Sequence, residues 1–117
     1  MKGKNIDGQL RAIHSKAWTP KFKWSEENIS TVPKKSGVYE FYDNTGKLLY
    51  VGVSKKDDYG NLRHRIESYH EKDDYTVHPT KKMLRPKIAE FRYKTVPIRD
   101  AREIEHHFKK HTPFNFL

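Results

Sequence analysis

The clearest pattern in the chain is a pair of neighbouring segments, residues 37–43 and 47–53, that are rich in aromatic and β-branched side chains. Such residues favour β-strands. Between them, Asp-Asn-Thr-Gly at positions 43–46 consists of residue types that favour a tight turn. The pattern therefore predicts a β-hairpin.

The length of the hairpin turn decides how Tyr39 and Tyr50 are placed. If residues 43–46 form a four-residue loop, Tyr39 lies directly opposite Tyr50 and both rings share one face of the sheet. A three-residue loop would place the rings on opposite faces, because successive side chains of a strand alternate. We expect the four-residue loop. By itself, such an aromatic pair also fits ordinary cross-strand packing.

Two further segments have the spacing of regular elements. Asn61 precedes a segment in which Leu62, Ile66 and Tyr69 recur on one helical stripe, so we expect a helix with Asn61 as its cap. Residues 88–95 are predicted to form a strand, because uncharged and charged side chains alternate from Ala89 to Thr95.

The remaining expected helices lie toward the two ends of the chain. Ser25 has the character of an N-cap, with Trp24 before it and Ile29 after it as a hydrophobic staple around a short helical turn. Asp100 is followed three residues later by a glutamate, a pattern similar to a capping box. It predicts a last helix that begins at Asp100 and ends before Pro113.

The order of these elements predicts an α+β fold. We expect a small three-stranded antiparallel sheet flanked by helices, in the order β-β-α-β-α. A length of 117 residues fits one compact domain. We divide the chain into a basic and aromatic extension at residues 1–32, packed on the domain, and the domain itself at residues 33–117.

Two charged side chains lie at or near positions that helical spacing turns toward the interior. Glu105 shares a stripe with Ala101 and Ile104. A carboxylate there is costly unless it is paired or binds a metal. An ion pair with an arginine is the simpler explanation, and metal ligation is the alternative. Arg65 lies beside the apolar stripe of its helix and reaches either solvent or a phosphate oxygen.

The charge balance points to a polyanionic partner. Lys and Arg number 24 against 15 Asp and Glu, a formal charge of +9, which favours nucleic acid first and an anionic membrane surface second. The sequence contains no cysteine, which excludes disulfides, thiolate metal sites and cysteine nucleophiles. It has no apolar signal segment and no stretch long enough to span a bilayer. We expect a cytoplasmic protein without a membrane partner. The sequence leaves the oligomeric state open, with a monomer as one alternative.

Several short motifs occur in the order that one known family shows. Gly-Val-Tyr at positions 37–39 is followed, after ten residues, by Tyr-Val-Gly at positions 50–52. The other matching residues lie on the two main expected helices and in the C-terminal segment: Arg65, Tyr69, Glu105 and Asn115. Together these motifs resemble the GIY-YIG nuclease family over residues 33–116.

The resemblance implies a divalent-metal-dependent endonuclease that hydrolyses DNA phosphodiester bonds. It makes Glu105 the ligand of one Mg²⁺ or Mn²⁺ ion and Arg65 the residue that holds the scissile phosphate. A tyrosine would take the proton of the attacking water. We favour Tyr50 for this role, with Tyr39 positioning the water. The ordinary pKa of tyrosine, about 10, would have to be lowered by nearby cations.

The resemblance also assigns supporting residues. Tyr69 matches a residue near the active site of the family, and Asn115 matches one that supports the site. Val53 departs from the pattern, because many members have lysine there, and Lys55 or Lys56 in the following longer loop is the candidate substitute. The side chains expected to bind nucleic acid are Lys55, Lys56, Arg63, Lys81, Lys82 and Arg85. The alternative function is a non-catalytic nucleic-acid-binding module that retains the fold.

Overall fold

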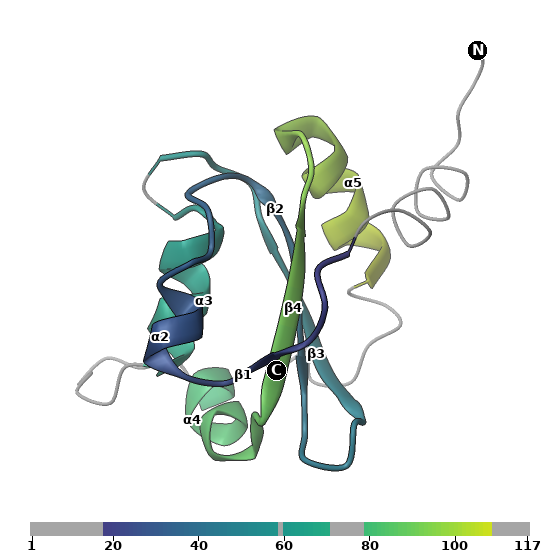
Figure 1. Ribbon diagram of the computed structural model, residues 1–117. Helices are drawn as coiled ribbons and strands as arrows, with labels where there is room; N and C mark the ends of the chain where they lie inside the picture. The colour runs from purple at the N-terminus through teal and green to yellow at the C-terminus, as the bar shows by residue number, and fades with distance from the viewer. Residues whose placement is uncertain (1–17, 59, 71–78, 109–117) are drawn as a thin grey trace.

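The computed structural model describes residues 18–58, 60–70 and 79–108 (Figure 1). The elements follow in the order β1 (Phe22–Lys23), α2 (Glu26–Ile29), β2 (Gly37–Tyr42), β3 (Leu48–Ser54), α3 (Leu62–His70), α4 (Pro79–Leu84), the 3-10 turn η1 (Arg85–Lys87), β4 (Glu90–Thr95) and α5 (Ile98–Phe108). The predicted α+β class is confirmed. None of these helices combines the length and the apolar character that crossing a lipid bilayer requires.

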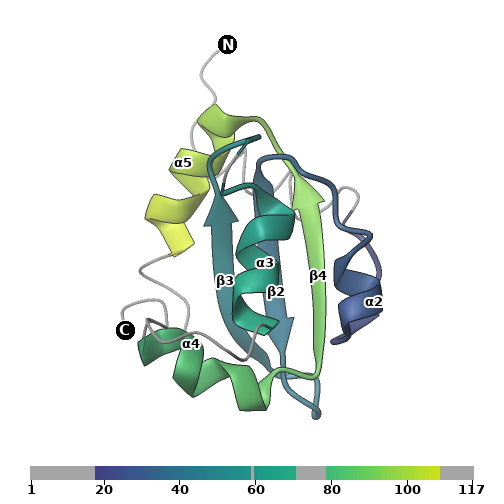
Figure 2. The same ribbon diagram turned by 90° about the vertical axis from the view of Figure 1, so that its left-hand side faces the viewer.

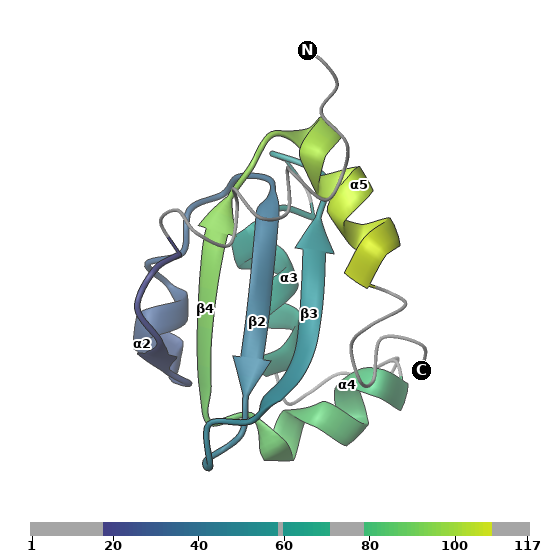
Figure 3. The same ribbon diagram turned by 90° about the vertical axis from the view of Figure 1, so that its right-hand side faces the viewer.

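The strands form one antiparallel sheet in the order β1-β4-β2-β3. Among the described residues the sheet thus has four strands instead of the three expected. The additional strand comes from the predicted extension, where Phe22 pairs with Phe91 and Lys23 pairs with Glu90 of β4. Helix α3 covers one face of the sheet, and α5 lies alongside β3 (Figures 2 and 3).

The turn of the β2–β3 hairpin is shorter than predicted. The backbone N–H of Asp43 donates to the carbonyl of Lys47 at 2.9 Å, so only residues 44–46 form the loop. Gly46 has a φ of 87°, the left-handed conformation that such three-residue loops use at this position. The Asp43 carboxylate accepts hydrogen bonds from the Thr45 hydroxyl and from the backbone of Lys47 and Thr45, which lower the pKa of Asp43.

A β-bulge in β3 changes the register beyond this loop. Leu49 is the extra residue, and beyond it Phe41 pairs with Tyr50. Tyr39 therefore lies opposite Gly52, so the predicted direct pairing of Tyr39 with Tyr50 was wrong. The bulge nevertheless returns Tyr50 to the face that carries Tyr39 and Phe41, so the shared face of the two tyrosines is confirmed.

Two apolar clusters lie on the two faces of the sheet. The larger joins the sheet to α2, α3 and α4 and includes Ile29, Tyr39, Phe41, Leu62, Ile66, Leu84 and Phe91. The smaller joins β2 and β3 to α5 and consists of Val38, Val51, Val53, Val96, Ala101 and Ile104. Because β3 is an outer strand of the sheet, side chains from helices on both faces can meet around its edge.

Two of the predicted helix caps are confirmed. The Asn61 side chain accepts a hydrogen bond from the backbone N–H of His64 at 3.0 Å. The Ser25 hydroxyl accepts one from the N–H of Asn28 at 3.2 Å. Each bond satisfies a backbone donor that the first turn of a helix leaves without a partner.

The predicted start of the last helix was wrong. Helix α5 begins at Ile98, and the N–H of Ala101 already donates to the carbonyl of Pro97 at 3.0 Å. Asp100 therefore lies within the first turn, where its negative charge still favours the helix dipole but its side chain does not occupy the cap position. The expected end before Pro113 lies outside the described residues. Strand β4 begins at Glu90, two residues later than expected.

Candidate active site

Three tyrosines from three different elements meet on the α3 face of the sheet. Tyr39 comes from β2, Tyr50 from β3 and Tyr69 from α3. The ring centroids are 6.3 Å apart for Tyr39–Tyr50 and for Tyr39–Tyr69, and 5.9 Å apart for Tyr50–Tyr69. Tyr39 and Tyr69 are buried, whereas Tyr50 is half-buried. The structure thus brings together three of the residues expected in the site.

Charged side chains from two helices act on this cluster. The pKa of Tyr39 is raised above its ordinary value, mainly by burial and then by the interaction with Tyr50. The Arg65 guanidinium and a hydrogen bond with Tyr69 oppose this rise in the pKa, and the Glu105 carboxylate adds to it. The Tyr39 hydroxyl is therefore within electrostatic reach of both Arg65 on α3 and Glu105 on α5.

The tyrosine hydroxyls differ in the role that they can take. Burial, followed by the interactions with Tyr39 and Tyr50, also raises the pKa of Tyr69. Hydrogen bonding with Tyr50 and Tyr39 contributes to this rise, because a bond that the Tyr69 hydroxyl donates is lost when the hydroxyl ionises. The lowering of a tyrosine pKa expected from nearby cations does not occur at Tyr39, because burial outweighs Arg65.

Glu105 lies at the border of the contact between α5 and the sheet. Ala101 and Ile104 on the same stripe are buried, whereas the side chain of Glu105 is 32% exposed. Its carboxylate lies 2.9 Å from the ammonium nitrogen of Lys55. An ion pair was the simpler expectation at this position, and the structure contains one with a lysine in place of an arginine. Glu103 is exposed.

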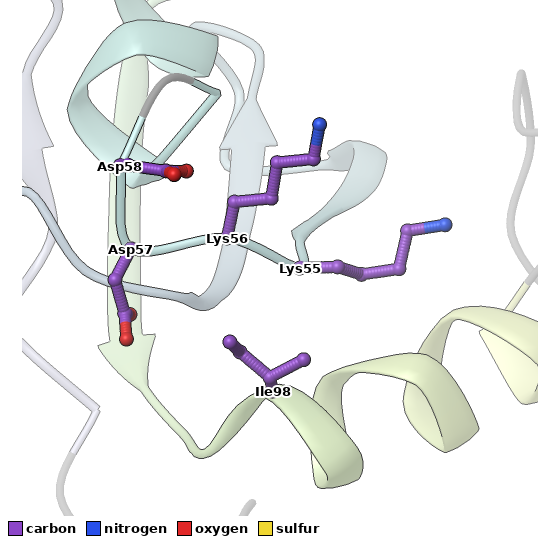
Figure 4. Close-up of a pocket in the computed structure, with 5 residues that line it drawn as sticks. All are labelled: Lys55, Lys56, Asp57, Asp58 and Ile98. Carbon is purple, nitrogen blue, oxygen red and sulfur yellow. The ribbon is translucent and has the colours of Figure 1, made fainter.

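The loop after β3 is held by hydrogen bonds of its own. The hydroxyl of Ser54, which is fully buried, donates to the carbonyl of Gly60 at 2.7 Å. The Asp57 carboxylate accepts the backbone N–H of Ser36 at 2.8 Å. Together with the start of α5, this loop forms a shallow pocket of about 480 Å³ lined by Lys55, Lys56, Asp57, Asp58 and Ile98 (Figure 4). The two lysine side chains leave the loop in different directions (Figure 4).

Two arginines expected to bind nucleic acid also make structural hydrogen bonds around α3. The Nε of Arg63 donates to the carbonyl of Val32 at 2.8 Å and connects α3 to the segment after α2. The Nε of Arg85 donates to the carbonyl of Tyr69 at 2.7 Å, near the C-terminal end of α3. These contacts fix the position of α3. Arg65 on the same helix is exposed.

One of the expected basic side chains on α4 lies close to the tyrosine cluster. The ammonium nitrogen of Lys81 lies 5.4 Å from the centroid of the Tyr69 ring. Lys82 on the same helix and Lys56 in the loop after β3 are exposed. Helices α4 and α5 lie along the β3 side of the sheet, near its two ends (Figures 2 and 3). Asn115, the remaining expected site residue, lies outside the described residues.

The side chains near the tyrosine cluster suit a magnesium ion better than a structural zinc ion. In the described parts of the chain, no three His, Cys, Asp or Glu side chains lie close enough together to hold a metal ion. A structural zinc site, which needs four such ligands, is therefore not found there. Mg²⁺ commonly takes one or two carboxylates and keeps several waters, so the accessible carboxylate of Glu105 fits a hydrated magnesium ion.

Comparison with known proteins decides the family. A family model described as the UvrC-like GIY-YIG domain matches residues 35–115. The chain belongs to the GIY-YIG nuclease family. It is 40% identical over 88 residues to the UvrABC system protein C of Flavobacterium psychrophilum, which covers 73% of this chain and 13% of that protein. The protein of the same name from Christiangramia forsetii is 37% identical over 95 residues, covering 79% of this chain and 15% of the relative.

A third relative, the UvrABC system protein C of Flavobacterium johnsoniae, is 39% identical over 85 residues, which are 70% of this chain and 13% of that protein. The chain therefore spans 13–15% of the length of these relatives. The identity and the family match concern the GIY-YIG domain alone.

The two glycines of the GIY-YIG motif have structural roles that the sequence analysis did not assign. A Cβ on Gly52 would overlap the ring and hydroxyl of Tyr39, and a Cβ on Gly37 would meet the Lys94 carbonyl and come within 2.7 Å of the Leu62 side chain. Gly52 thus lets the Tyr39 ring lie across β3, and Gly37 lets β4 and α3 approach β2. A glycine inside a strand pattern is a signal of such close approach.

Proposed function

We propose that this chain is a metal-dependent endonuclease that hydrolyses DNA phosphodiester bonds. The observation that carries the proposal is the convergence of three tyrosines with the charges of an arginine and a glutamate at the β3 edge. Apolar packing does not require charged side chains beside buried phenols. Membership of the GIY-YIG family supports the same reaction class, and the net charge of +9 suits a polyanionic substrate.

Each side chain has a task that its surroundings support. Arg65 is exposed on α3 and would hold the scissile phosphate by charge-assisted hydrogen bonds, which also stabilise the negative charge that develops on it. Tyr50 in its ionised form would accept the proton of the attacking water at its phenolate oxygen and become a neutral phenol, and it is the half-buried member of the cluster. Tyr69 would support this step through its position beside Tyr50, with the two ring centroids 5.9 Å apart.

The remaining residues would position the reactants. Tyr39 would orient the attacking water, because its raised pKa keeps its hydroxyl protonated and able to donate. Glu105 would hold one divalent cation, Mg²⁺ or Mn²⁺, which supplies charge neutralisation at the departing 3′ oxygen. Asn115 would support the site, as in other family members. Lys56, Lys81, Lys82 and the arginines of α3 and η1 would bind the DNA backbone, in contacts that are sensitive to salt and largely independent of sequence.

One experiment tests the proposal directly. Supercoiled plasmid is incubated with the chain, with and without Mg²⁺, and the relaxed and linear products are measured. We expect cleavage only with the ion, and none by Glu105→Gln. Glu103→Gln is the matched control, because it removes the same charge from an exposed position on the same helix, and it should cleave as the unchanged chain does. Cleavage by Glu105→Gln at the rate of the unchanged chain would refute the proposed metal centre.

A non-catalytic nucleic-acid-binding module is the second candidate function, and one observation favours it. The Glu105 carboxylate already has Lys55 as a partner at 2.9 Å, so its charge is compensated without a metal ion. The plasmid experiment separates the two functions, because a binding module would retard the DNA in a gel without cleaving it in Mg²⁺ or Mn²⁺.

A further inference from the structure

The ion pair between Lys55 and Glu105 joins two groups that are expected to have other partners, a lysine expected from the sequence to bind nucleic acid and the proposed metal ligand. The carboxylate would hold the cation and the ammonium would contact DNA, yet they lie 2.9 Å apart. We propose that Lys55 exchanges partners: it neutralises Glu105 in the free chain and moves to a DNA phosphate when a divalent cation takes the carboxylate. This inference rests on the proposed function and adds a specific role for Lys55.

The exposure of the pair permits such an exchange. The side chains of Lys55 and Glu105 are 37% and 32% exposed. Ion pairs this accessible are weak, because water screens the two charges and holding two long side chains together costs entropy. A divalent cation carries twice the charge of the ammonium group, so it can displace Lys55 from the carboxylate.

The backbone around Lys55 confines the movement to its side chain. Lys55 directly follows Ser54, a fully buried residue whose hydroxyl is bonded to the carbonyl of Gly60. The hydrogen bond from Ser36 to Asp57 fixes the far side of the loop. A lysine ammonium lies at the end of a flexible four-carbon chain, so it can reach new positions while the loop stays in place.

The pocket beside the pair offers a place for the new partner. Lys55 and Lys56 line it together with Asp57, Asp58 and Ile98 (Figure 4), and the Asp57 carboxylate already accepts a hydrogen bond from the Ser36 N–H. A DNA strand that enters this pocket would bring its phosphates to both ammonium groups, next to the carboxylate of Glu105. Binding of the cation would then release Lys55 for DNA, and by thermodynamic reciprocity DNA would strengthen binding of the cation.

The test measures the affinity for Mn²⁺ alone, without DNA, by titration calorimetry or from the electron paramagnetic resonance signal of the unbound ion. Lys55→Met should tighten binding roughly three- to tenfold, because it removes the group that competes for Glu105 and one nearby positive charge. Lys56→Met is the matched control. It removes the same charge from the adjacent exposed residue, and it should change Mn²⁺ affinity by less than about twofold. Glu105→Gln should abolish binding at this site.

A second measurement tests whether Lys55 can bind DNA once it is released from Glu105. The affinity for DNA is measured in EDTA, which removes divalent cations. Glu105→Gln should strengthen DNA binding, because it removes a negative charge and frees Lys55. The same substitution made in Lys55→Met should have a smaller effect, and the difference measures the coupling between the two residues.

The outcomes separate this inference from the proposed function. If Lys55→Met and Lys56→Met bind Mn²⁺ alike while Glu105→Gln does not bind it, the exchange is refuted and the metal centre stands. If Glu105→Gln binds Mn²⁺ as the unchanged chain does, Glu105 is not the ligand and both proposals fail.

Discussion

The aromatic ring of Tyr39 lies over the backbone of Gly52, in the space that a Cβ at position 52 would occupy. The two residues are paired across β2 and β3, so the ring extends from the inner strand over the outer one. This arrangement holds the Tyr39 hydroxyl in the same cluster as Tyr50 and Tyr69. A position without a side chain thus determines where the Tyr39 hydroxyl lies.

We predict that Gly52→Ala lowers both stability and cleavage. The added methyl group must displace a fully buried ring, and such overpacking costs about 1–3 kcal/mol of unfolding free energy. Displacement of the Tyr39 hydroxyl should reduce cleavage more strongly than stability, because the site depends on its position. Urea denaturation and the rate of plasmid cleavage measure the two effects.

Gly46→Asn is the control for this substitution. Gly46 lies in the hairpin turn with a φ of 87°, and no heavy atom lies within 4 Å of the place that its Cβ would take. Asparagine tolerates this backbone conformation better than other residues with a side chain. Stability should therefore change by less than about 1 kcal/mol, with cleavage retained. A Gly52→Ala variant as stable and active as Gly46→Asn would contradict the close approach of Tyr39.

The hairpin shows why the sequence predicts faces more reliably than pairs. The aromatic and β-branched residues predict both strands, and the glycine marks the turn. Whether the loop has three or four residues, and whether Leu49 forms a bulge, depends on how the strands pack against the rest of the chain. The two errors compensate, because each shifts the register by one residue, and Tyr39 and Tyr50 keep their common face.

In the site as well, local sequence patterns predict single residues but not the partners that the fold brings to them. Glu105 could be singled out because a carboxylate on an apolar helical stripe needs a partner. Its partner, Lys55, is fifty positions earlier in the sequence, and no local pattern connects the two. The added strand β1 is similar, because Phe22 and Lys23 become a strand only through pairing with β4. Such contacts follow from the fold and not from periodicity.

The buried tyrosines predict a loss of stability at alkaline pH. Burial raises the pKa of Tyr39 and of Tyr69 above the ordinary 10.0. In the unfolded chain these groups ionise near pH 10, whereas in the folded chain they stay neutral to higher pH. Their contribution to stability is therefore complete below pH 10 and is lost as the pH rises above it, by about 1.4 kcal/mol for each pH unit and group.

The comparison that checks this is between the unchanged chain and Tyr69→Phe, by urea denaturation between pH 8 and pH 11. Phenylalanine keeps the ring of Tyr69 but removes the ionisation, so its stability should fall less steeply above pH 10. Both proteins carry the same lysines, whose titration therefore cancels in the difference. Parallel pH profiles for the two proteins would show that Tyr69 ionises freely in the folded state.

A buried charge network on the other face of the sheet predicts an effect on stability alone. The carboxylate of Glu40, a buried residue, accepts a hydrogen bond from the Nε of Arg92 at 2.6 Å and another from the Tyr42 hydroxyl. Arg92→Leu would leave the carboxylate buried without its counter-charge. Loss of one partner of a buried pair costs about 3–5 kcal/mol, and partial exposure of Arg92 should reduce this to about 2–4 kcal/mol.

The double variant Glu40→Leu with Arg92→Leu provides the control. It removes both charges, so most of the lost stability should return. Cleavage at a temperature where all variants are folded should remain unchanged, because Glu40 and Arg92 lie on the face opposite the tyrosine cluster. A double variant less stable than Arg92→Leu would mean that the network contributes more than charge compensation.

Arg63 and Arg65 lie only two residues apart on α3, yet their surroundings differ, so we predict different effects when each is replaced. Arg65 is exposed and opposes the rise that burial causes in the pKa of Tyr39, whereas the Nε of Arg63 is bonded to the carbonyl of Val32 at 2.8 Å. Arg65→Ala should leave stability within about 0.5 kcal/mol, and it should slow cleavage of saturating DNA by a factor of about 10²–10³, because a positioned donor to the reacting phosphate is lost.

Arg63→Ala is expected to do the reverse. Loss of its hydrogen bond leaves the Val32 carbonyl without this donor and should cost about 1–2 kcal/mol of unfolding free energy, while cleavage of saturating DNA changes only a few fold. Each variant removes one positive charge from the same helix, so the general attraction to DNA falls alike in both. A difference in cleavage rate between the two variants then reflects the position of each guanidinium group, because the loss of charge is the same. Equal cleavage by the two variants would mean that Arg65 contributes only to the field of the surface, and the phosphate-binding role would have to pass to another residue.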